Sequence, residues 1–145
     1  MAEADLMQLY SRRILALTTT IPHLGTIEAP DASAMRRSPH CGSSVTVHLG
    51  LQDGRIARFG QEVRACALGQ ASASVLGSAV IGMDRATIAD ARDRLSAMLK
   101  QDGPAPDGPF AELEALLPAR EYPNRHASIL LAWDATLEAM DKAAA

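Results

Sequence analysis

Three things are scarce in this chain of 145 residues: aromatic side chains, cysteine and long apolar runs. Aromatic residues make up 3% of the sequence, so the core has to be built from small and aliphatic side chains. The longest strongly apolar stretch, residues 129–133, is far too short to span a bilayer. The N-terminal segment MAEADLMQLYSRR contains no apolar run of signal-peptide length. These absences predict a cytoplasmic protein with no membrane partner.

Charge of neither sign dominates the chain. Its 14 basic and 17 acidic residues give a net charge of −3, and they form no basic stripe. Since few rings are available to stack on bases, nucleic acid is not an expected partner. The hydrophobic fraction of 48% is typical of a globular protein, and a chain of this length needs neither metal nor disulfide merely to fold. We therefore expect a single domain over residues 1–145.

The hydrophobic pattern changes its period along the chain. Helical spacing predicts an N-terminal helix over residues 4–17, and residues 25–40 show little periodicity and are expected to form a loop or an irregular extended segment. Alternation through residues 44–51, followed by the turn pair Asp53-Gly54, predicts a β-hairpin with a return strand at 55–59. A third strand is expected at residues 61–65.

Helical patterns occupy the rest of the chain. Residues 67–82 are rich in small side chains and predict a buried, closely packed helix, and further helices are expected at 85–100, 110–117 and 124–142. Residues 101–109 contain two glycines and three prolines and predict a loop. Strands followed by helices favour an α+β fold: an N-terminal helix, a three-stranded antiparallel sheet, and three to four helices packed on one face.

Cys41 and Cys66, the only cysteines, each lie at a junction between predicted elements. Cys41 precedes the first strand in Ser-Pro-His-Cys-Gly-Ser, and Cys66 lies between a strand and a helix. A thiol at a helix N-terminus faces the positive end of the helix dipole, which favours thiolate, and Arg64 is expected to add to this effect. In a cytoplasmic protein the two thiols are expected to be reduced. The alternative is a pair of buried packing cysteines.

The residues around these cysteines resemble a known family. Its features are Pro39-His40-Cys41-Gly42, the hairpin that follows, and Ala65-Cys66-Ala67 running into Gln70-Ala71-Ser72-Ala73-Ser74. Together they look like the IscU/SufU/NifU N-terminal family of iron–sulfur cluster assembly scaffolds, closest to the SufU type. That family shows Cys-Gly-Asp before a hairpin, then Cys before an Ala-Ser-x-Ser helix, and a third Cys near a C-terminal helix. The resemblance extends to Leu131-Ala132-Trp133 and implies one SufU-like scaffold domain.

Two positions depart from the family pattern. Ser43 stands where the family has Asp, and Ser128 stands where it has the third Cys if the alignment is anchored on Trp133. A second register, anchored on His126, places Ala127 there instead. We prefer the first register, because Arg125 then matches a SufU-like Arg-x-x-Cys.

The resemblance implies Cys41 and Cys66 as cofactor ligands for an iron–sulfur cluster or zinc. The metal would be held weakly, because serine hydroxyls are poor ligands and only two thiols remain. His126 and Ser128 are the further candidate metal ligands, and His40 is an alternative. The implied partners are a cysteine desulfurase, which hands sulfur to one of the cysteines, and recipient apo-proteins that take the cluster.

The leading hypothesis is therefore an iron–sulfur cluster assembly scaffold or sulfur acceptor, which is not an enzyme. The competing hypothesis is a degenerate module that keeps the scaffold fold and its partner surface but no longer builds clusters. A Cys-His hydrolase using Cys41 with His40 or His126 is disfavoured, because no Asn/Asp orienting residue or oxyanion motif accompanies them.

Overall fold

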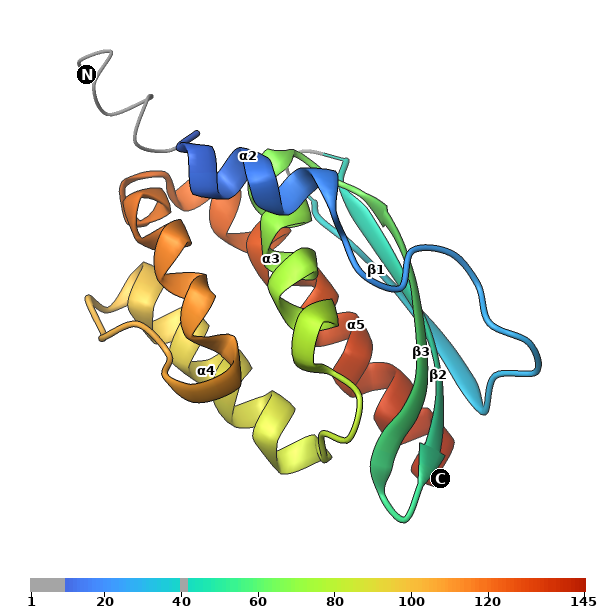
Figure 1. The fold of residues 1–145 in the computed structure, drawn as a ribbon. Coiled ribbons are helices and arrows are strands. Elements are labelled where there is room, and N and C mark those ends of the chain that lie inside the picture. Colours follow the sequence, from blue (N-terminus) through green and yellow to red (C-terminus); the bar gives the residue numbers. More distant parts are fainter. Residues whose placement is uncertain (1–9, 40–41) are drawn as a thin grey trace.

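A three-stranded antiparallel sheet forms one layer of the structure, and helices pack on one of its faces (Figure 1). The computed structural model describes residues 10–39 and 42–145. Its elements in chain order are α2 (Arg12–Thr19), β1 (Ala32–Arg37), β2 (Ser44–Gln52), β3 (Arg55–Arg64), α3 (Ala67–Ala79), α4 (Arg85–Lys100), the 3₁₀ segments η1 (Gly108–Glu121) and η2 (Pro123–Arg125), and α5 (His126–Ala144). The predicted α+β fold is confirmed.

Within the described residues, the first helix is α2. Ser11 caps it by accepting a hydrogen bond from the backbone N–H of Ile14 at 3.3 Å, and the helix continues to Thr19. Residues 4–9, where the sequence predicts the start of a helix, lie outside the described part of the chain. Ile14 is fully buried, and α2 packs against α3 and η1.

The central hairpin forms where the alternating pattern predicts it. β2 pairs with β3 around Asp53-Gly54, whose φ angles of 55° and 77° are the left-handed values that a two-residue hairpin turn requires. The inward-facing valines and leucine of β2 are fully buried, while its other face carries polar residues. β3 runs without a break to Arg64, so the separate strand predicted at residues 61–65 is wrong.

The third strand is β1, inside the segment predicted to be a loop or an irregular extended segment. It pairs antiparallel with β2, placing Ala32 opposite Leu49 and Arg37 opposite Ser44. Its sequence, ASAMRR, shows little alternation of apolar and polar residues. An edge strand has one neighbouring strand and a partly covered face, so its residues need not alternate strictly. The pairing is set by the β2 backbone, which local sequence does not reveal.

The helices follow the predicted boundaries with three exceptions, of which the first is that α3 ends at Ala79 and not at residue 82. α3 and α4 begin where expected, and Asp84 caps α4 through a 2.9 Å hydrogen bond from the backbone N–H of Thr87. The helix predicted at 110–117 is a 3₁₀ segment, η1, which contains Pro118 and non-helical dihedral angles at Phe110. α5 starts at His126, because the three residues before it form the 3₁₀ turn η2.

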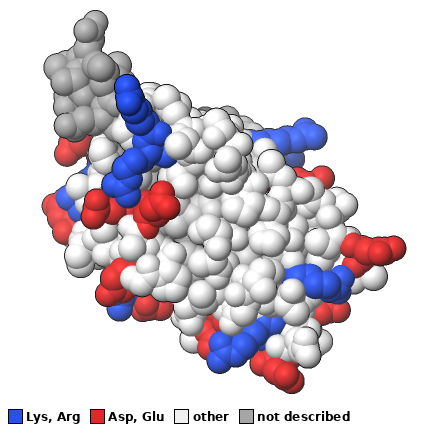
Figure 2. Space-filling view, viewed as in Figure 1, with Lys and Arg blue, Asp and Glu red and all other residues white. Residues whose placement is uncertain are grey.

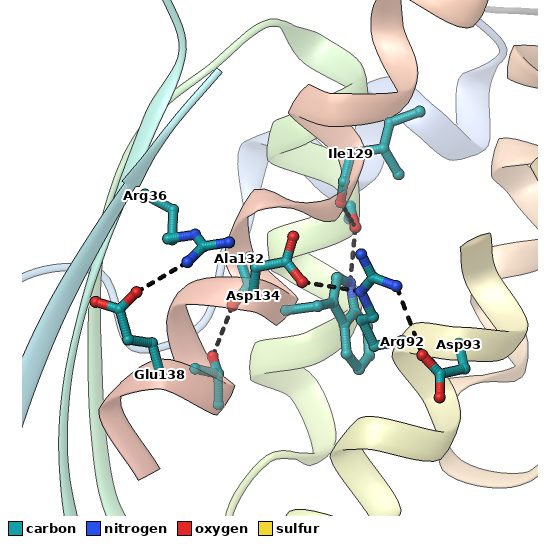
Figure 3. A network of polar contacts seen from close by, with 10 residues as sticks. Arg36, Arg92, Asp93, Ile129, Ala132, Asp134 and Glu138 are labelled. Atoms are coloured by element: carbon teal, nitrogen blue, oxygen red, sulfur yellow. Dashed lines mark hydrogen bonds and ion pairs between the residues drawn. The ribbon is translucent and has the colours of Figure 1, made fainter. Parts of the chain in front are cut away.

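α5 lies between the sheet and the other helices, and ion pairs fix it on both sides (Figure 3). Arg36 of β1 binds Glu138 at 2.9 Å, and Arg92 of α4 binds Asp134 at 2.8 Å. The second pair is the more protected, since both side chains are at most 30% exposed. These contacts hold the helix whose first turn carries Ser128.

The surface seen from the helical side is largely uncharged at its centre. Figure 2 shows Lys and Arg interspersed with Asp and Glu around the rim of this face, with uncharged atoms over the middle. This face, as far as its described residues show, carries no continuous basic stripe of the kind that follows a nucleic acid backbone. None of the helices in residues 10–39 and 42–145 is long and apolar enough to cross a membrane.

Candidate functional site

Cys66 lies where β3 ends and α3 begins, as a half-buried free thiol in the N-cap position of the helix. Its Sγ lies 3.6 Å from the Oγ of Ser128, in the first turn of α5. The Oγ of Ser128 also lies within hydrogen-bond distance of the Oγ of Ser43, at 3.2 Å. Figure 1 shows the N-terminal ends of α3 and α5 and the start of β2 at the same end of the molecule. The structure therefore brings Cys66 together with both serines that the sequence marks as departures.

The surroundings of the Cys66 sulfur favour its ionised form. Burial raises the pKa of this thiol, but opposing interactions together bring the pKa below its ordinary value. The backbone N–H of Gly69 makes the largest single contribution to this lowering of the pKa, followed by the Ser128 hydroxyl, the backbone N–H of Leu68 and the Arg125 side chain. Cys66 makes no regular capping hydrogen bond, so these groups act as dipoles and a charge oriented toward the sulfur.

Gly69 allows α3 to approach the first turn of α5 closely. A Cβ atom at this position would lie 2.7 Å from the Oγ of Ser128 and 2.8 Å from the Cβ of Ala65. Contacts this short are not tolerated between real atoms, so any side chain here would displace Ser128 from Cys66. The glycine is required by the packing of the site.

Ser72 joins α3 to α5 one turn further along the helix. Its hydroxyl donates to the carbonyl oxygen of Ile129 at 2.7 Å and accepts a 2.9 Å hydrogen bond from Nε1 of Trp133, and Ser72 is fully buried. The Ala-Ser-Ala-Ser run predicts helix packing, and at Ser72 the structure shows that role. The register between the two helices, and with it the distance from Cys66 to Ser128, depends on this residue.

His126, a predicted metal ligand, is turned into the protein. It is 5% exposed, and its Nε2 lies 2.9 Å from the carbonyl oxygen of Ala119. Because a carbonyl oxygen only accepts hydrogen bonds, Nε2 carries the proton in this arrangement, and only Nδ1 retains a lone pair for a metal. A ligand role for His126 stays a prediction that depends on Nδ1.

Cys41 and His40 lie outside the described residues, so the predicted meeting of the two thiols stays a prediction. The residues on either side are described. The backbone N–H of Ser38 donates to the carbonyl oxygen of Ser43 at 2.8 Å, which closes the two ends of this short connection beside the Ser128 hydroxyl. The chain therefore enters and leaves the segment with Cys41 next to the site of Cys66.

The described donor atoms do not suit a resident zinc ion. Structural zinc takes four ligands from thiolate, imidazole and carboxylate groups, whereas this cluster offers one thiol and the hydroxyls of Ser43 and Ser128. A serine hydroxyl is a poor ligand because it would have to ionise from a far higher pKa. Within residues 10–39 and 42–145, no group of three His, Cys, Asp or Glu side chains could hold a metal ion.

The sequence leaves open whether Arg64 or Arg125 faces the site, and the arginine that acts on Cys66 is Arg125. Arg125 lowers the pKa of the thiol, while Arg64 is exposed at the end of β3. Strand alternation explains the difference, because it turns Arg64 to the face of the sheet that the helices leave open. The signal for Arg125 is its place immediately before α5, three residues ahead of Ser128.

The comparisons with known proteins agree with this architecture. Residues 9–126 match the family described as the NifU-like N terminal domain. The chain is 26% identical over 145 residues to the iron–sulfur cluster assembly scaffold protein IscU of Streptococcus pyogenes serotype M1, covering 99% of this chain and 90% of that one. It is 24% identical over 134 residues to the protein of the same name from Thermotoga maritima, covering 92% and 94% of the two chains.

Solved structures show the same fold. The N-terminal NifU-like protein of Brucella abortus has a TM-score of 0.94 and 42% identity, with 97% of each chain covered. An iron–sulfur cluster assembly scaffold protein for the SUF system from Fervidobacterium islandicum AW-1 has a TM-score of 0.83 at 21% identity, covering 92% of this chain and 98% of that one. With a family match over residues 9–126, this chain belongs to the NifU-like N-terminal domain family.

Proposed function

We propose that this domain serves iron–sulfur cluster assembly as a sulfur-accepting scaffold. Cys66, together with Cys41, receives sulfur from a cysteine desulfurase and holds it, with iron, as cargo for recipient apo-proteins. The domain is then a carrier and assembly surface, and not an enzyme. The observation that supports this most directly is the half-buried Cys66 thiol, whose pKa is lowered at the N-terminus of α3.

The chemistry of sulfur transfer suits such a thiol. The Cys66 thiolate attacks the outer sulfur of a persulfide on the desulfurase, so one S–S bond forms while another breaks and the desulfurase thiolate leaves. No net oxidation or reduction takes place, and no metal is needed. A lowered pKa raises the fraction of thiolate, and the half-buried position leaves the sulfur accessible to a partner.

The two serines limit how the cargo is held. Ser43 and Ser128 bond to one another, and neither supplies a thiolate or carboxylate to iron. Two thiols, Cys41 and Cys66, are then the strong ligands, so a cluster assembled here is weakly anchored and readily given up. His126 through Nδ1 and Ser128 are the remaining candidates for a further ligand.

A second function is favoured by the same serines. A domain in which hydroxyls occupy two ligand positions keeps the fold and can dock partners without assembling a cluster. The hydrogen bond between Ser128 and Ser43 supports this alternative, because the two polar groups satisfy each other without any metal.

Cluster reconstitution distinguishes the two functions. The full chain is purified anaerobically and incubated with a cysteine desulfurase, cysteine, ferrous iron and a dithiol reductant, which supplies the two electrons that turn each persulfide sulfur into sulfide. Bound iron, acid-labile sulfide and visible absorbance are then measured. The scaffold function predicts sulfide and iron on the wild type, with loss in Cys66→Ala and in Cys41→Ser. Absence of both from the folded wild type would contradict it and favour the docking module. Cys66→Ala that loads like the wild type would remove Cys66 from the site.

A further inference from the structure

One face of the sheet is not covered by any described helix, and the chain itself crosses part of it. The helices pack on the inner face, and residues 25–31, which we call the strap, run across the outer face from β3 to β1. Arg58 donates to the carbonyl oxygens of Glu28 and Ala29 in the strap, and a Cβ at Gly60 would lie 2.6 Å from the carbonyl oxygen of Gly25. The strap therefore closes the hairpin half of this face and leaves the other half open.

The open half lies at the same end of the sheet as Cys66. Strand register places its outward residues in rows: Arg37, Ser44 and Arg64 form the row at the end of the sheet, and Met35, Thr46 and Glu62 form the next. These six residues line a shallow cavity of 230 Å³. Met35 is 51% exposed within it. We call the first row, Arg37, Ser44 and Arg64, the basic row.

Both arginines of the basic row lack an ion pair with any described carboxylate, although most other described arginines have an acidic or carbonyl partner. Glu62, the one acidic side chain among the described residues that line the cavity, is engaged elsewhere: its Oε2 lies 3.0 Å from Nε2 of His48. His48 is itself fixed from the other side, with Nδ1 2.7 Å from the Oγ of Ser33. This chain of contacts across three strands directs the carboxylate toward His48 and leaves the guanidinium groups unneutralised.

The spacing suits an acidic segment of a protein. Arg37 and Arg64 lie on strands separated by β2, so their backbones are about 10 Å apart. An extended chain presents side chains on one face about 7 Å apart, within reach of two long and flexible arginine side chains. Met35 adds an apolar contact next to the two charges.

The basic row also lies close in sequence to the two cysteines of the proposed site. β3 ends at Arg64, two residues before Cys66, and the connection from β1 to β2 that carries Cys41 starts one residue after Arg37 and ends one residue before Ser44. A partner bound over this row would lie against both segments. We propose that the basic row and Met35 form the docking surface for an acidic segment of the cysteine desulfurase that donates sulfur to Cys66, an inference that rests on the proposed function.

Charge reversal with a matched control tests this surface. Binding of the full-length desulfurase to the full chain is measured by titration calorimetry for the wild type, Arg37→Glu/Arg64→Glu and Arg12→Glu/Lys100→Glu. The control removes two other exposed cations without a described ion pair, on α2 and at the end of α4, with the same change in net charge. The test variant is expected to bind about tenfold more weakly or worse at low salt, and the control within about twofold of the wild type.

Raising the salt concentration should weaken desulfurase binding by the wild type until its affinity approaches that of the test variant, because the difference in affinity is electrostatic. Equal weakening in both double variants, or none in either, would overturn the proposal. So would weakened binding of a recipient apo-protein with desulfurase binding intact. Should circular dichroism show that the reversal disturbs folding, Arg37→Gln/Arg64→Gln replaces it, with an intermediate loss expected and an unchanged affinity contradicting the docking surface.

A small-molecule donor separates this inference from the proposed function. Inorganic polysulfide should load Cys66 equally in the wild type and in Arg37→Glu/Arg64→Glu, since no docking is involved. If polysulfide and desulfurase both fail to load the wild type, the proposed sulfur-accepting function fails, while the binding comparison still decides whether this surface docks the desulfurase.

Discussion

Restoring the two ligand types that this chain lacks should create a metal site. The variant is Ser43→Asp/Ser128→Cys. A tetrahedral zinc ion with metal–ligand distances of 2.0–2.3 Å places neighbouring ligand atoms about 3.3–3.8 Å apart. The observed separations are 3.6 Å from the Cys66 sulfur to the Ser128 oxygen and 3.2 Å from that oxygen to the one of Ser43. The separation between Cys66 and Ser128 therefore falls within the edge lengths of a zinc tetrahedron, and position 43 lies close enough for the longer side chain of Asp to reach the same ion.

The double substitution is expected to lower the stability of the metal-free protein and to let zinc raise it. Without metal, the variant should be less stable than the wild type, because it places a carboxylate at a position only 4% exposed. With zinc at a hundred times its dissociation constant, binding should raise the free energy of unfolding by about 2.7 kcal/mol. For a domain of this size that corresponds to a rise in Tm of roughly 5–10 °C.

Differential scanning calorimetry with and without zinc, together with the zinc content of the dialysed protein, measures both effects. About one zinc per chain is expected in the double variant, and far less in the wild type and in Cys66→Ser carrying the same two substitutions. A folded double variant with no more zinc than the wild type would refute the reasoning that this backbone preserves a ligand geometry.

Two further predictions follow from the packing and charge of the site. Ser72→Ala leaves the Trp133 N–H without its buried partner and should lower the free energy of unfolding by about 2 kcal/mol in a denaturant titration. The control is Ser78→Ala, which removes a hydroxyl that bonds within its own helix and should change the free energy of unfolding by less than about 0.5 kcal/mol. Equal effects of the two substitutions would contradict the role of Ser72. In a Cys41→Ser background, the pH profile of Cys66 alkylation should have its midpoint below that of an ordinary thiol, because the pKa of Cys66 is lowered. Adding Ser128→Ala should shift this midpoint upward. A midpoint at or above that of an ordinary thiol would contradict the thiolate assignment.

The hairpin and the main helices could be predicted because local sequence determines them. Alternation over β2 and the Asp53-Gly54 pair are sufficient to indicate two strands and their turn. The six residues of β1 carry no periodic pattern, so the sequence predicts only a loop or an irregular extended segment there, and they form a strand by pairing with the edge of β2. η1 departs from the predicted α-helix because it contains Pro118 and has non-helical dihedral angles at Phe110. The spacing of hydrophobic residues, on which the prediction rests, indicates neither feature.

The site shows the same division between local and tertiary information. The resemblance places Ser43 and Ser128 at ligand positions, and the structure brings them together with Cys66, although Ser128 lies 85 positions after Ser43 and 62 after Cys66 along the chain. The direction of a side chain is a different matter. Nothing in the sequence shows that His126 turns toward Ala119, because that depends on the path of η1 past the start of α5.

The central claim, that Cys66 accepts sulfur, is tested most directly by mass spectrometry. The full chain is incubated with a cysteine desulfurase and cysteine, and its thiols and persulfides are then blocked with an alkylating agent. The protein is digested without reductant, and the mass of the peptide that contains Cys66 is measured. An added sulfur atom is expected on Cys66 in the wild type and in Ser128→Ala, and none is expected when cysteine is omitted. Sulfur found only on Cys41, or on neither cysteine of a folded wild type that binds the desulfurase, would contradict the claim.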